Sequence, residues 1–109
     1  MITSEQFDSV DMRVGTVTAV SENKKARHPA YKVTVDLGPA LGTKTSSAQI
    51  TVLYPPEELV GRQIICCVNL APMHIGSVKS EVRILGSDSA DGVVLIAPDR
   101  AVKNGDRIF

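Results

Sequence analysis

The sequence predicts an all-β fold, a small barrel of five or six strands formed by one domain over residues 1–109. Apolar residues alternate with polar ones, or run unbroken, in short stretches, and Gly, Pro, Asn and Asp separate these stretches. The chain has 109 residues, of which 43% are hydrophobic, which is enough to build one core. Because no internal repeat, low-complexity tract or flexible linker interrupts the pattern, we expect a single domain.

The N-terminal part predicts a short helix followed by a strand. Thr3 and Gln6 have the spacing of a capping box, which predicts a helix through about Ser9. The residues of 13–21 are rich in Val and Thr, whose β-branched side chains favour extended backbone. Gly15 lies early in this strand and indicates a bulge or a sharp bend.

Two further strands are predicted before the middle of the chain. From Tyr31 to Leu37, apolar residues alternate with polar ones, which indicates one buried and one exposed face. Gly38 and Pro39 end this strand. After a loop that contains a glycine, residues 45–52 predict another strand.

The middle of the chain predicts a helical turn and a buried strand. Residues 55–61 begin with two prolines and end with a glycine, which is typical of a short helical turn. Residues 63–71 are apolar almost without interruption, so we expect this strand to be covered on both faces. We therefore predict that it is the central strand of the barrel.

The C-terminal third predicts additional strands. Residues 80–85 alternate again, and residues 93–96 form an apolar run. The polar segment 86–92 between them predicts a hairpin loop. Asn104 and Gly105 mark a last turn before the chain ends.

Charge and hydropathy limit the kind of partner and the location. The chain has 12 basic and 12 acidic residues, so any nucleic-acid site has to be local. The first ten residues include Glu5 and Asp8 and no long apolar stretch, which is unlike a signal peptide or a membrane span. We therefore expect a cytoplasmic protein without membrane insertion.

No arrangement of residues predicts catalysis, a metal or a cofactor. Cys66 and Cys67 are neighbours in an apolar run, where they read as buried small hydrophobic residues. Ser46 and Ser47 lack the flanking glycines of a nucleophile elbow, and His74 is a lone loop histidine. We expect a protein that is not an enzyme, with no catalytic residue, no metal and no cofactor.

One stretch of the chain is strongly basic. Lys24, Lys25, Arg27, His28 and Lys32 follow one another without an acidic residue between them. Such a cluster can contact an RNA backbone even when the net charge is zero, although a solvated loop is the alternative. Only four residues are aromatic, so recognition of RNA shape and backbone is favoured over base stacking.

Two other stretches, 46–51 and 69–75, combine hydrogen-bonding groups with small or flexible apolar ones. Gln49 and Asn69 can each donate and accept, which suits the amides of an extended peptide as well as a nucleotide. Leu70, Met73 and Val78 add aliphatic surface, and methionine adapts to apolar partners of different shape. An ordinary strand end and loop is the alternative interpretation.

Six stretches resemble a known family in order and spacing across nearly the whole chain. They are Asp11–Val17, Ala26–Val33, Ser46–Thr51, Gly61–Gln63, Asn69–Pro72 and Ser80–Val82. These stretches resemble the CsaA protein-secretion chaperones, a branch of the tRNA-binding domain family. Two positions depart from the family pattern: Met73, where arginine or lysine is usual, and Val78, where phenylalanine is usual.

The resemblance implies a fold, partners and site residues. The fold would be a five-stranded OB-fold barrel with a short N-terminal helix, a mid-chain helical turn and C-terminal strand additions. The partners would be a second copy in a homodimer, tRNA, and unfolded or precursor polypeptides. The resemblance leaves open whether the secretion motor ATPase is a further partner. Together with the basic stretch, the implied tRNA contacts are Lys24, Lys25, Arg27, Lys32, Ser46, Ser47, Gln49, Asn69, Lys79, Ser80 and Glu81. The implied polypeptide contacts are Leu70, Met73, Val78, Gln49 and Asn69.

The C-terminal apolar residues need a cover that a small barrel does not supply. We expect the dimer interface to include Val94, Leu95, Ile96, Val102, Ile108 and Phe109. Whether polypeptide or tRNA is the main ligand stays open, because the alternative is a structure-specific tRNA-binding protein with no chaperone role.

Overall fold

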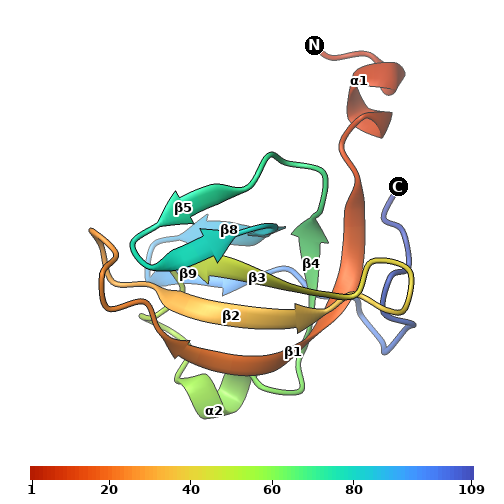
Figure 1. Ribbon diagram of the computed structural model, residues 1–109. Coiled ribbons are helices and arrows are strands. Elements are labelled where there is room, and N and C mark those ends of the chain that lie inside the picture. The colour runs from red at the N-terminus through yellow and green to blue at the C-terminus, as the bar shows by residue number, and fades with distance from the viewer.

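The computed structural model describes residues 1–109 as an antiparallel five-stranded sheet, in the order β3-β2-β1-β4-β7, that curls into a nearly closed barrel (Figure 1). Two smaller hairpins, β5–β6 and β8–β9, extend it. The strands are β1 (Met12–Glu22), β2 (Tyr31–Asp36), β3 (Thr43–Ala48), β4 (Gln63–Cys67), β5 (Met73–Ile75), β6 (Val78–Ser80), β7 (Arg83–Ile84), β8 (Gly86–Ser89) and β9 (Gly92–Leu95), and the helices are α1 (Ser4–Asp8) and α2 (Pro56–Leu59). The predicted all-β OB-fold class is confirmed. Neither helix is long and apolar enough to span a membrane.

Helix α1 forms as the capping box predicts. The Gln6 N–H donates to Thr3 Oγ1 at 3.1 Å, and the Thr3 N–H donates to Gln6 Oε1 at 2.9 Å. The helix buries none of its residues, and Figure 1 shows it standing away from the barrel. Its side chains therefore contribute nothing to the core of this chain.

Strand β1, not β4, occupies the centre of the sheet, so the prediction of β4 as the central strand is wrong. β1 has 11 residues, and its length lets it pair with β4 along its first half and with β2 along its second half. The predicted burial on both faces is confirmed for 64–67, but the strand expected over 63–71 ends at Cys67, and residues 69–71 are exposed.

Gly15 is required for close packing rather than for a bulge. The irregularity in the β1–β2 register lies between Val17 and Ala19, so the predicted bulge at Gly15 is not present. A Cβ atom at Gly15 would lie 2.5 Å from Val35 Cγ1 and 2.7 Å from Leu37 Cδ2, inside van der Waals contact. The backbone of β1 therefore lies so close to the side chains of β2 and Leu37 that only glycine fits at this position.

We expect Gly15→Ala to lower the free energy of unfolding by about 1–3 kcal/mol, because the added methyl group overpacks the core. Urea denaturation followed by circular dichroism measures this change. Ser21→Ala, at an exposed position of the same strand, is the matched control and is expected to stay within about 0.5 kcal/mol of the wild type. A Gly15→Ala protein as stable as this control would contradict the close packing.

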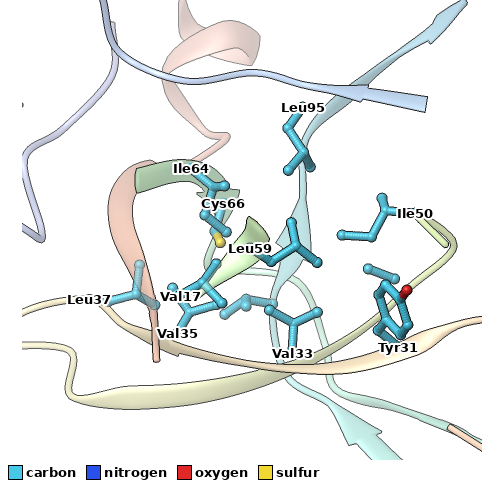
Figure 2. Close-up of a cluster of buried hydrophobic side chains, with 12 residues drawn as sticks. Val17, Tyr31, Val33, Val35, Leu37, Ile50, Leu59, Ile64, Cys66 and Leu95 are labelled. Atoms are coloured by element: carbon cyan, nitrogen blue, oxygen red, sulfur yellow. The ribbon is translucent and has the colours of Figure 1, made fainter. Parts of the chain in front are cut away.

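The core lies inside the barrel and is closed at one end by α2. Figure 2 shows Leu59 of α2 among the side chains of β1, β2 and β4, and Leu59 is fully buried. The Tyr31 hydroxyl donates to Tyr54 O at 2.9 Å, which ties β2 to the segment before α2. The predicted helical turn is confirmed, and burying Leu59 is the reason for its position.

Several strand boundaries differ from the prediction. The strand expected over 45–52 runs over Thr43–Ala48, and the strand expected over 80–85 is split between β6 and β7. The split occurs because the N–H groups of Glu81 and Val82 both donate to Thr45 O on β3. The hairpin expected to join 80–85 to 93–96 is different: β9 pairs with β8, which occupies most of the predicted loop, while β7 pairs with β4.

The C-terminal segment runs along the first half of β1, where β2 does not reach. The Val14 N–H donates to Asp106 O at 3.0 Å, and the Ile108 N–H donates to Met12 O at 2.9 Å. The Arg13 guanidinium donates to Gly105 O at 3.1 Å. The turn predicted at Asn104 and Gly105 is confirmed by its positive φ of 93° at Gly105. Residues 11–17 therefore anchor the C-terminus.

Candidate ligand groove and basic end

A groove of about 780 Å³ opens between the end of β3, the β5–β6 hairpin and strands β7 and β8. It brings together the two stretches, 46–51 and 69–75, that the sequence singled out. Its lining consists of Val10, Ser46, Ser47, Ala48, Gln49, Ile50, Cys67, Leu70, Ala71, Met73, Ile75, Ser80, Glu81, Val82, Arg83, Ile84, Leu85, Gly86, Asp88 and Val93. Twelve of these 20 residues are hydrophobic, so the groove is mainly apolar.

The groove presents aliphatic side chains to solvent. Met73 is 64% exposed and Leu70 is 48% exposed, and Gln49 is exposed beside them. Half-buried Ile75 and Ile84 extend the apolar surface. An exposed apolar patch of this kind in a concave site is typical of a binding surface.

Eight lining residues lie outside the stretches 46–51, 69–75 and 80–82 and were not predicted as site residues. They are Val10, Cys67, Arg83, Ile84, Leu85, Gly86, Asp88 and Val93. They come from separate segments, and each segment reads by itself as an ordinary strand or loop. Only the closure of the barrel brings them to the groove.

Two residues predicted as polypeptide contacts have other roles. Val78 is 3% exposed and does not line the groove, so it has no surface from which to contact a ligand. Asn69 uses both ends of its amide within the chain: Oδ1 accepts from the Asp11 N–H at 3.0 Å, and Nδ2 donates to Ser9 O at 2.7 Å. Asn69 therefore ties the end of β4 to the segment between α1 and β1.

The polar residues shared by β3 and β6–β7 close the barrel. The Ser47 N–H donates to Ser80 Oγ at 3.0 Å, and the Thr45 N–H donates to Glu81 Oε1 at 3.1 Å. Ser46, which was predicted as a tRNA contact, is 1% exposed. Ser80 and Glu81 thus use side-chain oxygen atoms to close the barrel, and Ser46 is buried within it.

Hydrogen bonding lowers the pKa of the Glu81 carboxyl. The main cause is the Thr45 N–H, which the Thr45 hydroxyl and the charges of Lys44 and Lys79 reinforce, while partial burial acts in the opposite direction. Because the pKa is lower in the folded state, this carboxylate stabilises the fold above its ordinary pKa of 4.5. The stabilisation is lost as the pH falls through the lower folded value.

We therefore expect the Glu81→Gln protein to lose less stability than the wild type when the pH falls from 6 to 3, because the amide does not titrate. Thermal unfolding at several pH values measures this. Glu57→Gln, at an exposed carboxylate of α2 outside these hydrogen bonds, is the control and is expected to keep the wild-type acid dependence. Parallel acid profiles for wild type and Glu81→Gln would contradict the role of Glu81.

The loop between β1 and β2 is pressed against the turn of the β5–β6 hairpin, at one end of the barrel (Figure 1). Asn23 is buried, and its Nδ2 donates to Ile75 O at 2.7 Å and to Ser47 Oγ at 3.0 Å. A Cβ atom at Gly76 would lie 2.6 Å from Ala26 N, so no side chain fits between the two segments. The sequence did not single out Asn23.

This contact gathers basic residues. Lys24, Lys25 and Arg27 are exposed on the loop; Lys32 is exposed on β2 opposite Ser47, and Lys79 is exposed on β6. We call these five residues the basic end. None of them is in a salt bridge. The basic end is therefore a local cationic surface on a chain of zero net charge.

The cysteines lie in the interior. Burial, with the neighbouring Cys67 as a smaller cause, raises the pKa of the Cys66 thiol to about 12. Because the thiolate is the nucleophilic form, Cys66 is unreactive at neutral pH. The structure also groups no three His, Cys, Asp or Glu side chains that could hold a metal ion.

The residues predicted for a dimer interface divide into two groups. Val94, Ile96 and Val102 are exposed, Phe109 is 99% exposed, and Ile108 is half-buried. Leu95 is 9% exposed and belongs to the core, so it is not available to an interface.

Residues 12–107 match the family model described as a putative tRNA binding domain. The chain is 33% identical over 107 residues to the methionine–tRNA ligase of Pyrococcus furiosus and 37% identical over 105 residues to that of Methanothrix thermoacetophila. These matches cover 98% and 96% of this chain but only 14% and 15% of the ligases. The chain thus spans about one seventh of the length of these curated relatives.

Three crystal structures resemble the whole chain. The CsaA chaperone protein of Picrophilus torridus has a TM-score of 0.96 and 44% identity, with 100% of this chain and 100% of that chain covered. The CsaA chaperone of Bacillus anthracis has a TM-score of 0.92 and 45% identity, with 100% of this chain and 99% of that chain covered. A protein related to methionyl-tRNA synthetase from Pyrococcus horikoshii has a TM-score of 0.87 and 30% identity, with 100% and 98% covered. The resemblance drawn from the sequence motifs is confirmed.

Proposed function

The chain belongs to the tRNA-binding domain family, and on this premise we propose that it is a non-enzymatic, homodimeric chaperone of the CsaA kind. It binds unfolded or precursor polypeptides in the groove and tRNA at the basic end. Neither ligand undergoes a reaction, because the recognition uses apolar contact, hydrogen bonds and charge.

The groove is the observation that carries the polypeptide-binding proposal. Leu70 and Met73 are exposed to water on an apolar surface, and covering them with an apolar segment removes that surface from solvent. The flexible thioether of Met73 can adapt to segments of different shape. Such a site favours weak binding that tolerates many sequences, as a chaperone requires.

The basic end supports tRNA as the second ligand. Its cations are exposed and form no salt bridge, so they are available to phosphate groups. Aromatic side chains are scarce, so the contacts would be to the RNA backbone and shape. The alternative function, a tRNA-binding protein with no chaperone role, would use this surface alone.

The homodimer is part of the proposal. Helix α1 buries none of its residues, and the C-terminal Phe109 is almost fully exposed. Arg107 Nη2 donates to Asp8 O at 3.4 Å, so the two chain ends lie together. A second copy that covers this surface would bury the exposed apolar residues of both ends. A monomer in analytical ultracentrifugation at micromolar concentration would remove this part of the proposal.

The function is tested by titrating the protein with labelled bulk tRNA and with a labelled apolar peptide, each at 50 and 200 mM salt. We expect binding of the peptide to change little with salt and binding of tRNA to fall steeply, because only tRNA releases counterions. Tight tRNA binding with no peptide binding would favour the alternative function. Turnover of either ligand would contradict a binding protein.

A further inference from the structure

Strand β8 forms one wall of the groove and has one edge without a partner strand. Its other edge pairs with β9. In an antiparallel pair, residues that bond the neighbouring strand alternate with residues whose N–H and C=O point away from it. The Ile96 N–H donates to Leu85 O at 3.2 Å, whereas the Leu95 N–H turns away to the Tyr54 hydroxyl at 3.0 Å.

This alternation assigns Gly86 and Asp88 to the free edge. Gly86 lies opposite Leu95 and Asp88 opposite Val93, so both occupy the positions that do not bond β9. No turn, loop or cap hydrogen bond uses the N–H or C=O of either residue. Both residues line the groove, so its wall carries backbone donors and acceptors spaced as in a strand.

Side chains around this edge define what fits against it. Met73 and Leu70 provide apolar surface to the same groove. Asp88 is exposed and has no ion-pair partner, which favours a cationic residue beside it. Gly86 has no side chain to cover its own peptide groups, and a Cβ atom there would lie 2.5 Å from Val93 Cγ1.

We infer that the groove binds its polypeptide as an extended strand that adds to the free edge of β8. The added strand exchanges backbone hydrogen bonds with Gly86 and Asp88. It directs alternate, apolar side chains towards Leu70 and Met73 and places a lysine or arginine near Asp88. This inference rests on the proposed polypeptide binding and adds the conformation and register of the ligand.

The first test removes the Asp88 N–H. In Asp88→Pro the edge loses one donor, and the β8–β9 pairing is kept because this N–H does not bond β9. The control is Asp88→Ala, which loses the carboxylate but keeps the N–H. The probe is a fluorescein-labelled peptide, Val-Ser-Val-Ser-Lys-Ser-Val-Ser-Val, and the readout is fluorescence anisotropy, with circular dichroism to verify the fold. We expect Asp88→Pro to bind about tenfold more weakly than Asp88→Ala, because the proline removes a bond and blocks close approach of the strand.

The second test uses the unchanged protein and two N-methylated forms of the same peptide. One form is methylated at the valines and the other at the serines, so that only one set of methyl groups faces β8. We expect one form to lose about tenfold in affinity relative to the other, since only one set of amides bonds the edge. Equal affinities of the two forms, or of folded Asp88→Pro and Asp88→Ala, would overturn the inference while leaving groove binding intact. A parent peptide that does not bind the wild type would overturn both the inference and the proposed polypeptide binding.

Discussion

Replacing Lys24, Lys25 and Arg27 together with glutamate is expected to weaken tRNA binding about a hundredfold or more at 0.1 M salt. Each phosphate contact contributes close to one unit to the slope of log affinity against log salt concentration. Losing three contacts from each protomer therefore lowers both the affinity and the salt slope. Filter binding or anisotropy with labelled tRNA between 50 and 300 mM salt measures both quantities.

This triple variant is expected to fold normally, because the three side chains are exposed and lie outside every salt bridge. The control is the double variant Arg100→Glu and Lys103→Glu, which reverses exposed charges on the C-terminal segment. If the control weakens tRNA binding as much per charge as the loop variant does, general electrostatic attraction is responsible and the basic end is not the tRNA site. Binding of the apolar peptide is expected to be unchanged in the loop variant.

Replacing Leu70 and Met73 together with aspartate is expected to weaken polypeptide binding about a hundredfold. Two apolar contacts are lost, and an apolar ligand in the groove would have to desolvate two carboxylates. Fluorescence anisotropy with the labelled peptide measures the loss. Since both side chains are about half exposed or more in the free protein, its stability is expected to change little.

The control for the groove variant is Val60→Asp, at an exposed valine that does not line the groove. It is expected to bind the peptide as the wild type does. Binding of tRNA by the groove variant is expected to fall much less than binding of the peptide. Equal losses on both ligands, in this variant or in the loop variant, would count against two separate sites.

The two proposed sites meet at Asn23, which contacts Ser47 and Ile75 of the groove lining and begins the basic loop. The Asn23 side chain bonds to Ser47, 24 residues further along the chain, and to Ile75, 52 residues further along. Its role is therefore visible only in the folded chain. A ligand that displaces either segment would disturb both surfaces.

Local structure was predictable because short-range chemistry decides it. The capping box at Thr3 needs only Gln6, and the turn at Asn104 and Gly105 needs only its own backbone freedom. The alternation in β2 predicted its buried residues correctly, since the side chains of a strand point to opposite faces. The basic loop was visible as well, because its residues are consecutive.

The sequence by itself determined the all-β class, most of the elements, the basic loop and two of the stretches, 46–51 and 69–75, that line the groove. The tertiary structure alone decided which of those residues remain free for a ligand. Asn69 is engaged by Ser9, 60 residues away, and Glu81 by Thr45, 36 residues away, while Val78 and Leu95 are buried. The physical reason is that hydrogen-bond partners and solvent exposure depend on segments distant in the chain, which no local pattern specifies.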